Sequence, residues 1–72
     1  MAPNPIIAVR IRERRERLGW TQAEPAQATG TTRATVGNYE AGRREPDAAT
    51  LLRLARALGT SVSYLLGETD DP

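Results

Sequence analysis

Residues 21–40, with the sequence TQAEPAQATGTTRATVGNYE, decide the fold of this chain. Gly30 divides the stretch into two short helical segments, because glycine can adopt the positive φ that ends one helix before a sharp turn. Ala26 is small enough for two helices to cross closely, and Val36 and Tyr39 are spaced to share the inward face of the second segment. The pattern predicts two helices joined by a tight turn, a helix-turn-helix.

Signals for helix ends continue on both sides of this motif. Asn4 and Pro5 are typical of a helix start and Gly19 of a helix end, which predicts a helix over residues 5–18. Similar signals predict helices over residues 22–29, 33–40, 48–58 and 62–66, with Thr21, Thr32, Asp47 and Ser61 as their N-terminal caps. No strand is predicted. We therefore expect an all-α fold, a compact bundle of five helices.

The composition narrows the range of functions. The chain has 72 residues, enough for one small hydrophobic core, and it contains no cysteine and no histidine. Disulfides, thiolate or imidazole metal sites and the usual nucleophile–base pairs are therefore excluded. We expect a protein that is not an enzyme and that uses no metal, cofactor or small-molecule ligand. The chain has no apolar run near the ~18 residues of a membrane span and no secretion signal at its start, which predicts a cytoplasmic location.

Charge is distributed unevenly along the chain. Residues 1–67 hold ten arginines and six acidic residues, a net charge of +4, whereas residues 68–72 form an acidic C-terminal tail with three acidic residues. The arginine-rich residues 10–17 are expected mainly to pair with glutamates of the same run on a solvated face. Three arginines near element ends are the better candidates for contacts with nucleic-acid phosphate: Arg10, Arg43 and Arg44.

Four stretches carry a resemblance to a known family. They are residues 18–24 (LGWTQAE), 30–33 (GTTR), 39–46 (YEAGRREP) and 51–59 (LLRLARALG). With them the chain resembles the helix-turn-helix domain of phage repressor and Cro-type regulators, the XRE family. The resemblance implies a lambda-repressor-like DNA-binding domain over residues 1–67, with the helix-turn-helix at about 22–40. It implies a small transcriptional repressor that binds double-stranded DNA, a pseudo-palindromic operator, as a homodimer.

Helical geometry divides the predicted helix 33–40 into two faces. At about 100° per residue, one face gathers Thr32, Val36, Tyr39 and Glu40, and the opposite face gathers Arg33, Ala34, Gly37 and Asn38. The second set is predicted to read DNA bases. Arg33 can donate two hydrogen bonds to guanine, Asn38 can pair with the edge of adenine, and Ala34 can offer its methyl group to a thymine. Gly37 lets the helix come close to a backbone.

The resemblance also implies roles for residues that position the reading helix. The family residue matching Gln22 contacts phosphate, and Thr32 caps the helix 33–40 where its N-terminus can meet a phosphate. Val62 and Tyr64 match family positions that touch the symmetry mate.

Arg15 interrupts an apolar stripe of the first helix that is formed by Ile7, Ile11 and Leu18. An arginine at this place needs a partner. The family pairs the matching residue with the one that matches Glu40, and the helical positions of both residues point inward. We expect a structural ion pair and not a DNA contact.

Pro25 stands where the family usually has leucine inside the first helix of the motif. Proline removes the amide that would bond back to Thr21 and crowds the carbonyl of that residue. The helix can start at Gln22 with a distorted first turn, which the Thr21–Glu24 capping pattern favours. Alternatively it can start at Pro25 with Glu24 as its cap, which places Gln22 outside the helix.

A second class of function competes with DNA reading. The same fold can serve in protein interaction, for example as an antitoxin or as an adaptor that binds another protein. DNA protection by the purified chain alone favours the regulator, whereas a co-purifying partner without DNA binding favours the adaptor.

Overall fold

The computed structural model describes residues 5–72, and these form five helices and no strand. The helices are α1 (Pro5–Arg17), α2 (Ala23–Thr29), α3 (Arg33–Glu40), α4 (Ala48–Ala57) and α5 (Val62–Leu66). The expected all-α fold is confirmed, and the predicted helix bounds agree with the observed ones to within one residue. The predicted cap of the first helix, Asn4, lies outside the described residues.

Side-chain caps start three of the helices, as the sequence predicts. The caps are Thr32, Asp47 and Ser61, whose side chains accept hydrogen bonds from the backbone N–H groups of Thr35, Thr50 and Tyr64 at 3.1, 2.8 and 3.0 Å. Each bond satisfies one of the donors that the first turn of a helix leaves unpaired. Local sequence alone therefore accounts for where α3, α4 and α5 begin.

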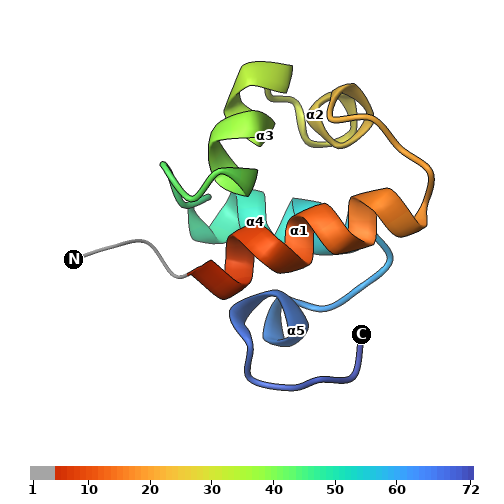
Figure 1. Cartoon of the computed structure of the whole chain (residues 1–72), viewed down its shortest axis with the longest axis vertical. Coiled ribbons are helices and arrows are strands. Elements are labelled where there is room, and N and C mark those ends of the chain that lie inside the picture. The colour runs from red at the N-terminus through yellow and green to blue at the C-terminus, as the bar shows by residue number, and fades with distance from the viewer. Residues whose placement is uncertain (1–4) are drawn as a thin grey trace.

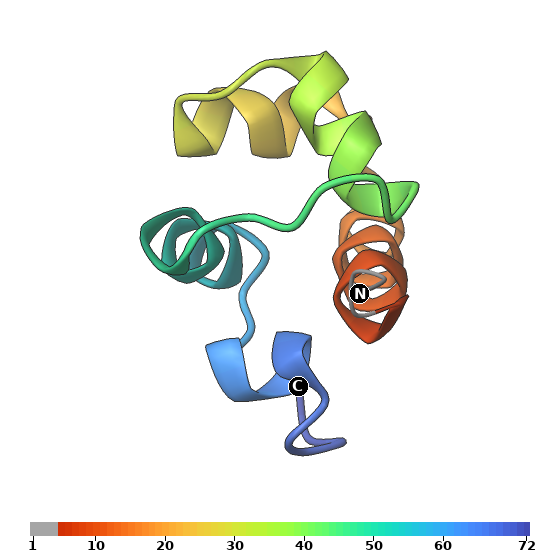
Figure 2. The ribbon, with the colours of Figure 1, turned by 90° about the vertical axis from the view of Figure 1, so that its left-hand side faces the viewer.

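The helix-turn-helix lies at one end of the molecule. Figures 1 and 2 show α2 and α3 together at this end, α1 and α4 across the middle, and α5 at the opposite end. α1 packs against α3 and α5, and α4 packs against α2 and α5. The main core cluster consists of Ile7, Ile11, Tyr39, Leu51, Leu54, Ala55, Leu58, Tyr64 and Leu65. Because α3 buries only Val36 and Tyr39, its opposite side is turned toward solvent.

Leu18 does not join the apolar stripe of α1, and this part of the prediction is wrong. Its side chain is 43% exposed, and the half-buried Trp20 packs against the core instead. The helix ends before Leu18, because Gly19 adopts a φ of +71° and the N–H of Trp20 donates to the carbonyl of Arg15 at 3.1 Å. The chain therefore turns away from the helix axis before the stripe is complete.

Pro25 is accommodated in the first turn of α2. The helix begins at Ala23, and Gln22 before it already has helical dihedral angles, as in the first of the two predicted alternatives. The carbonyl of Thr21 accepts the N–H of Glu24 at 3.3 Å, so the first turn is tightened to an i, i+3 bond. The Pro25 ring is fully buried. Pro25 thus falls among the first residues of the helix, whose N–H groups have no partner within the helix.

The capping pattern of α2 is formed from one side only. The carboxylate of Glu24 accepts the backbone N–H of Thr21, while the Thr21 hydroxyl lies 3.3 Å from the same carboxylate. Gln22 makes no side-chain cap bond.

The arginine run of α1 does not form the self-paired face that the sequence predicts. Within the run, the ion pairs of the described residues join Glu16 to Arg12 at 3.8 Å and to Arg15 at 4.0 Å. Arg10 and Arg14 instead donate to backbone carbonyls of the C-terminal half. The reason is the helical repeat, which places Arg10 beside α5 and Arg14 beside the C-terminal end of α4.

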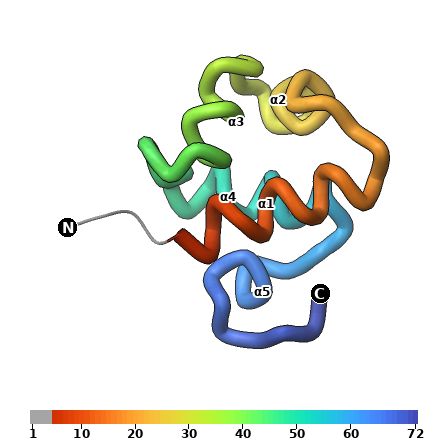
Figure 3. Tube along the Cα trace, viewed as in Figure 1, coloured from red at the N-terminus to blue at the C-terminus, as the bar shows by residue number. Residues whose placement is uncertain are grey.

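The acidic residues 68–72 turn back alongside α5 (Figure 3). Arg10 holds this segment, because its guanidinium donates to the carbonyl of Thr69 at 2.5 Å and to the carboxylate of Asp70 at 2.8 Å. Near the end of the segment, the Thr60 hydroxyl donates to the carbonyl of Pro72 at 3.2 Å.

Candidate nucleic-acid interface

The turn between α2 and α3 sets the angle at which α3 is presented. Gly30 has a φ of +71°, and the N–H of Thr31 donates back to the carbonyl of Ala26 at 2.9 Å. A left-handed residue at this place favours glycine, because a Cβ would crowd the backbone. Ala26 is 4% exposed, and α2 packs directly against α3. The predicted roles of Gly30 and Ala26 are thus those that the structure shows.

The outward face of α3 contains the four residues that the sequence assigns to base reading. Arg33 and Ala34 are exposed, and Gly37 and Asn38 are half-buried. Val36 lies on the opposite side and is fully buried. The structure therefore separates these four residues from Val36 and Tyr39 as helical geometry predicts. Thr32, which the same geometry places on the inward face, is exposed, because it precedes the helix as its N-terminal cap.

Arg33 is the first residue of α3. No hydrogen bond or ion pair joins its guanidinium to the residues that the structure describes. A cation at the positive end of a helix dipole is unfavourable for the helix itself. Its position is therefore not explained by helix stability.

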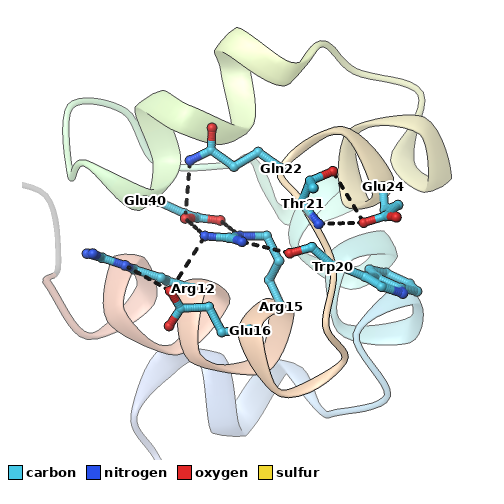
Figure 4. A network of polar contacts seen from close by, with 8 residues as sticks. All are labelled: Arg12, Arg15, Glu16, Trp20, Thr21, Gln22, Glu24 and Glu40. Atoms are coloured by element: carbon cyan, nitrogen blue, oxygen red, sulfur yellow. Dashed lines mark hydrogen bonds and ion pairs between the residues drawn. The ribbon is translucent and has the colours of Figure 1, made fainter.

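Gln22 lies across α3 at Gly37. A Cβ added to Gly37 would lie 3.4 Å from the side-chain oxygen of Gln22, and the amide nitrogen of Gln22 donates to the carboxylate of Glu40 at 3.3 Å. The close-up in Figure 4 shows this amide above the ion pair of Arg15 and Glu40. Gln22 therefore packs directly against Gly37, a contact that sequence reasoning missed because the two residues belong to different segments of the motif.

Arg15 and Glu40 form the ion pair that the sequence predicts. The Arg15 Nε donates to one carboxylate oxygen at 2.7 Å and an Nη donates to the other at 2.9 Å (Figure 4). Their side chains are 13% and 5% exposed. The remaining Nη of Arg15 donates to the carbonyl of Trp20 at 2.8 Å. The two-pronged geometry locks α1 to the C-terminal end of α3.

The same pair raises the pKa of Arg15 above its ordinary value. The largest cause is the hydrogen bond to Glu40, which outweighs the effect of burial. The guanidinium therefore stays charged, and Arg15 uses its Nε and both Nη atoms in hydrogen bonds within the chain.

Of the predicted phosphate contacts, Gln22, Thr32, Arg43 and Arg44 lie on or beside the helix-turn-helix. Arg43 and Arg44 are exposed in the loop that follows α3. Arg10 does not lie on this surface: it caps the carbonyl of Tyr64 at 2.7 Å and holds the tail. Its guanidinium, stacked 4.2 Å from the Tyr64 ring centroid, already has protein partners.

Arg12 is a residue of this surface that sequence reasoning missed. It is exposed and lines a shallow polar pocket together with Gln22, Gly37 and Ala41, between α1 and α3. Among the described residues, Arg12 forms an ion pair with the exposed Glu16 at 3.8 Å. The spacing to Arg15, three residues on the same helix face, is the signal that could have indicated it.

The predicted dimer residues differ in accessibility. Val62 is half-buried, whereas Tyr64 is 9% exposed and lies under the guanidinium of Arg10. Residues 5–72 contain no cluster of side chains that could hold a metal ion, and none of the described helices is long and apolar enough to cross a membrane.

A family model described as Helix-turn-helix (HTH_3) matches residues 11–65, which include α2, the turn and α3. The chain belongs to this family. The resemblance to XRE-type regulators and the lambda-repressor-like fold are thereby confirmed.

Two similar proteins are transcriptional regulators. The chain is 38% identical over 64 residues to the HTH-type transcriptional regulator ImmR of Bacillus subtilis. The aligned region covers 89% of this chain and 50% of ImmR. The crystal structure of the P22 c2 repressor with a synthetic operator has a TM-score of 0.83 and 33% identity, covering 88% of this chain and 96% of that chain. The chain spans about half the length of ImmR and of two further Bacillus subtilis regulators.

The fold also occurs within an enzyme. Hydroxypropylphosphonic acid epoxidase from S. wedmorenis has a TM-score of 0.80 and 32% identity over 89% of this chain, but only 34% of the enzyme chain is covered. Two thirds of that enzyme therefore have no counterpart here.

Proposed function

We propose that this chain binds double-stranded DNA in a sequence-specific manner and acts as a small transcriptional repressor. The observation that carries the proposal is the outward face of α3, where Arg33 has no protein partner and Asn38 lies further along the same helix. The match to an operator-bound repressor structure supports it. No catalytic step is assigned to the chain, and the cytoplasm is the location that fits a DNA ligand.

In this proposal α3 lies in the major groove. Arg33 reads a guanine, Asn38 reads a second base pair, and the Ala34 methyl contacts a thymine. Gly37 allows α3 to approach the DNA backbone closely. Phosphate contacts come from Gln22, Thr32, Arg12, Arg43 and Arg44, the first two from the helix-turn-helix and the others from its flanks.

We propose that two copies share one pseudo-palindromic operator. A reading helix of eight residues makes few base contacts, so a single copy binds weakly. Val62 is the more accessible of the two residues expected at the symmetry mate. Half-site centres are expected about 34 Å apart, one turn of DNA. Sedimentation of the chain with its selected operator should show two chains per duplex; one chain per duplex at saturation contradicts this part.

Selection of bound sequences from a random DNA pool tests the proposed function. The wild-type chain should enrich one motif, and Arg33→Ala should remove the preference at one base pair per half-site, a loss of about 1–3 kcal/mol per contact. Arg56→Ala is the matched control, because it removes an exposed arginine from α4, outside the proposed surface. Absence of any enriched motif, with a protein partner recovered instead, would favour the adaptor function.

A further inference from the structure

The chain reverses direction directly after α3. Gly42 has a φ of +73°, and the N–H of Arg43 donates to the carbonyl of Asn38 at 3.0 Å. Glycine is favoured here because the left-handed backbone is costly for residues with a Cβ. The reversal brings the start of the Arg43 side chain back to the last turn of α3.

The side chains of the two residues also meet. Nη1 of Arg43 donates to the Oδ1 oxygen of Asn38 at 3.4 Å. Arg43 is thus joined to Asn38 by one backbone hydrogen bond and one side-chain hydrogen bond. The interaction distinguishes the two ends of the Asn38 carboxamide, because only its oxygen can accept from a guanidinium.

We infer that Arg43 is a specificity-determining positioning residue, which sets the direction in which Asn38 presents its carboxamide to DNA. The inference rests on the proposed function. With Oδ1 turned to Arg43, the Nδ2 donors are directed away from it, and Oδ1 keeps a second lone pair. Asn38 therefore meets a base edge in one orientation, whereas a free carboxamide can turn over and exchange its donor and acceptor ends.

This role differs from the sequence-based expectation that Arg43 is an ordinary phosphate contact. A phosphate contact lowers the affinity for all DNA sequences equally. A residue that orients Asn38 changes the preference at the base pair that Asn38 reads. The neighbouring Arg44 is exposed like Arg43 and has the same charge, but it makes no hydrogen bond to Asn38, so it is the matched control.

The experiment measures affinities for the selected operator and for duplexes changed at single base pairs, with wild type, Arg43→Ala, Arg44→Ala and Asn38→Ala. Asn38→Ala should reduce discrimination at one base pair by about tenfold. Arg43→Ala should reduce discrimination at the same base pair by about threefold to fivefold, while Arg44→Ala leaves it unchanged. Each arginine variant should also lower the salt slope by about one, because both guanidinium groups are proposed to meet phosphates as well.

The double variant Arg43→Ala/Asn38→Ala completes the test. If Arg43 acts through Asn38, the double variant discriminates at that base pair no worse than Asn38→Ala alone. Equal loss of affinity for every duplex in Arg43→Ala, as in Arg44→Ala, would overturn the inference and leave the proposed function intact. A wild-type chain that prefers no duplex would overturn the proposed function itself. Thermal unfolding of each variant separates a loss of folding from a loss of preference.

Discussion

α1 uses arginine on two of its sides, and the two sides differ in what the arginines meet. On the side of α3, Arg15 meets a carboxylate, Glu40, that is 5% exposed. On the side of α4 and α5, Arg10 and Arg14 meet backbone carbonyls and the 98% exposed carboxylate of Asp70. Water can replace Asp70 as a partner of Arg10, whereas the buried Glu40 has no such replacement beside Arg15. Residue type alone therefore says little about the stability that an arginine contributes.

The largest expected effect tests the buried side of this contrast. Glu40→Ala should destabilise the fold by about 3–5 kcal/mol, because Arg15 keeps a charge without its carboxylate partner. In a domain of this size each kcal/mol lowers the unfolding midpoint by about 4–8 °C. Thermal unfolding followed by circular dichroism measures it. Glu40→Gln is the control, because it keeps the acceptor while removing the charge; a loss below about 1 kcal/mol in Glu40→Ala would contradict the contrast.

Arg10 tests the exposed side. Arg10→Ala removes two carbonyl contacts, the ion pair with Asp70 and the stacking on Tyr64, and should cost about 1–2 kcal/mol. Asp70→Ala removes the ion pair alone and should cost about 0–1 kcal/mol, less at high salt. Urea unfolding at low and high ionic strength compares the two. A cost for Arg10→Ala equal to that of Glu40→Ala would show that partner burial does not set the difference.

Gly37 tests how firmly the side chain of Gln22 is held beside the Arg15–Glu40 ion pair. Gly37→Ala should raise stability by about 0.5–1 kcal/mol through helix propensity, since the added Cβ meets Gln22 at an ordinary contact distance of 3.4 Å. Ala34→Gly is the matched converse on the exposed face of the same helix and should lose a similar amount. A lowered midpoint for Gly37→Ala would show that Gln22 is held too firmly to adjust.

The smallest expected effect concerns pH. The hydrogen bonds of Asp47 with Thr50 hold the pKa of that carboxylate below its ordinary value. Because the folded-state pKa is the lower one, the cap stabilises the fold above about pH 4, and this contribution is lost as the pH falls further through the folded-state value. Asp47→Asn keeps an acceptor without a titrating group. On acidification from about pH 5 to about pH 2, the thermal unfolding midpoint of Asp47→Asn should therefore fall less than that of the wild type. Equal decreases of the two midpoints would contradict a stabilising role of the Asp47 carboxylate.

Much of the fold and of the candidate interface could be predicted because it depends on local rules. The caps Thr32, Asp47 and Ser61 and the outward set of α3 follow from spacing along single helices. The helical repeat misplaces Leu18, and nearness to an element end misplaces Arg10. A helical repeat states which residues share a face, but not where the helix ends or which neighbour covers that face.

The sequence by itself determined the five helices, the caps of α3, α4 and α5, the glycine turns, and the division of α3 into an inward and an outward face, since these depend on interactions within a few residues. Only the tertiary structure decided that Gln22 lies on Gly37, that Arg43 meets Asn38 across the turn at Gly42, and that Arg10 holds the acidic tail. These contacts join residues whose approach depends on turn geometry and helix packing. Which of these side chains meet depends on the directions in which they point, and a sequence pattern does not contain those directions.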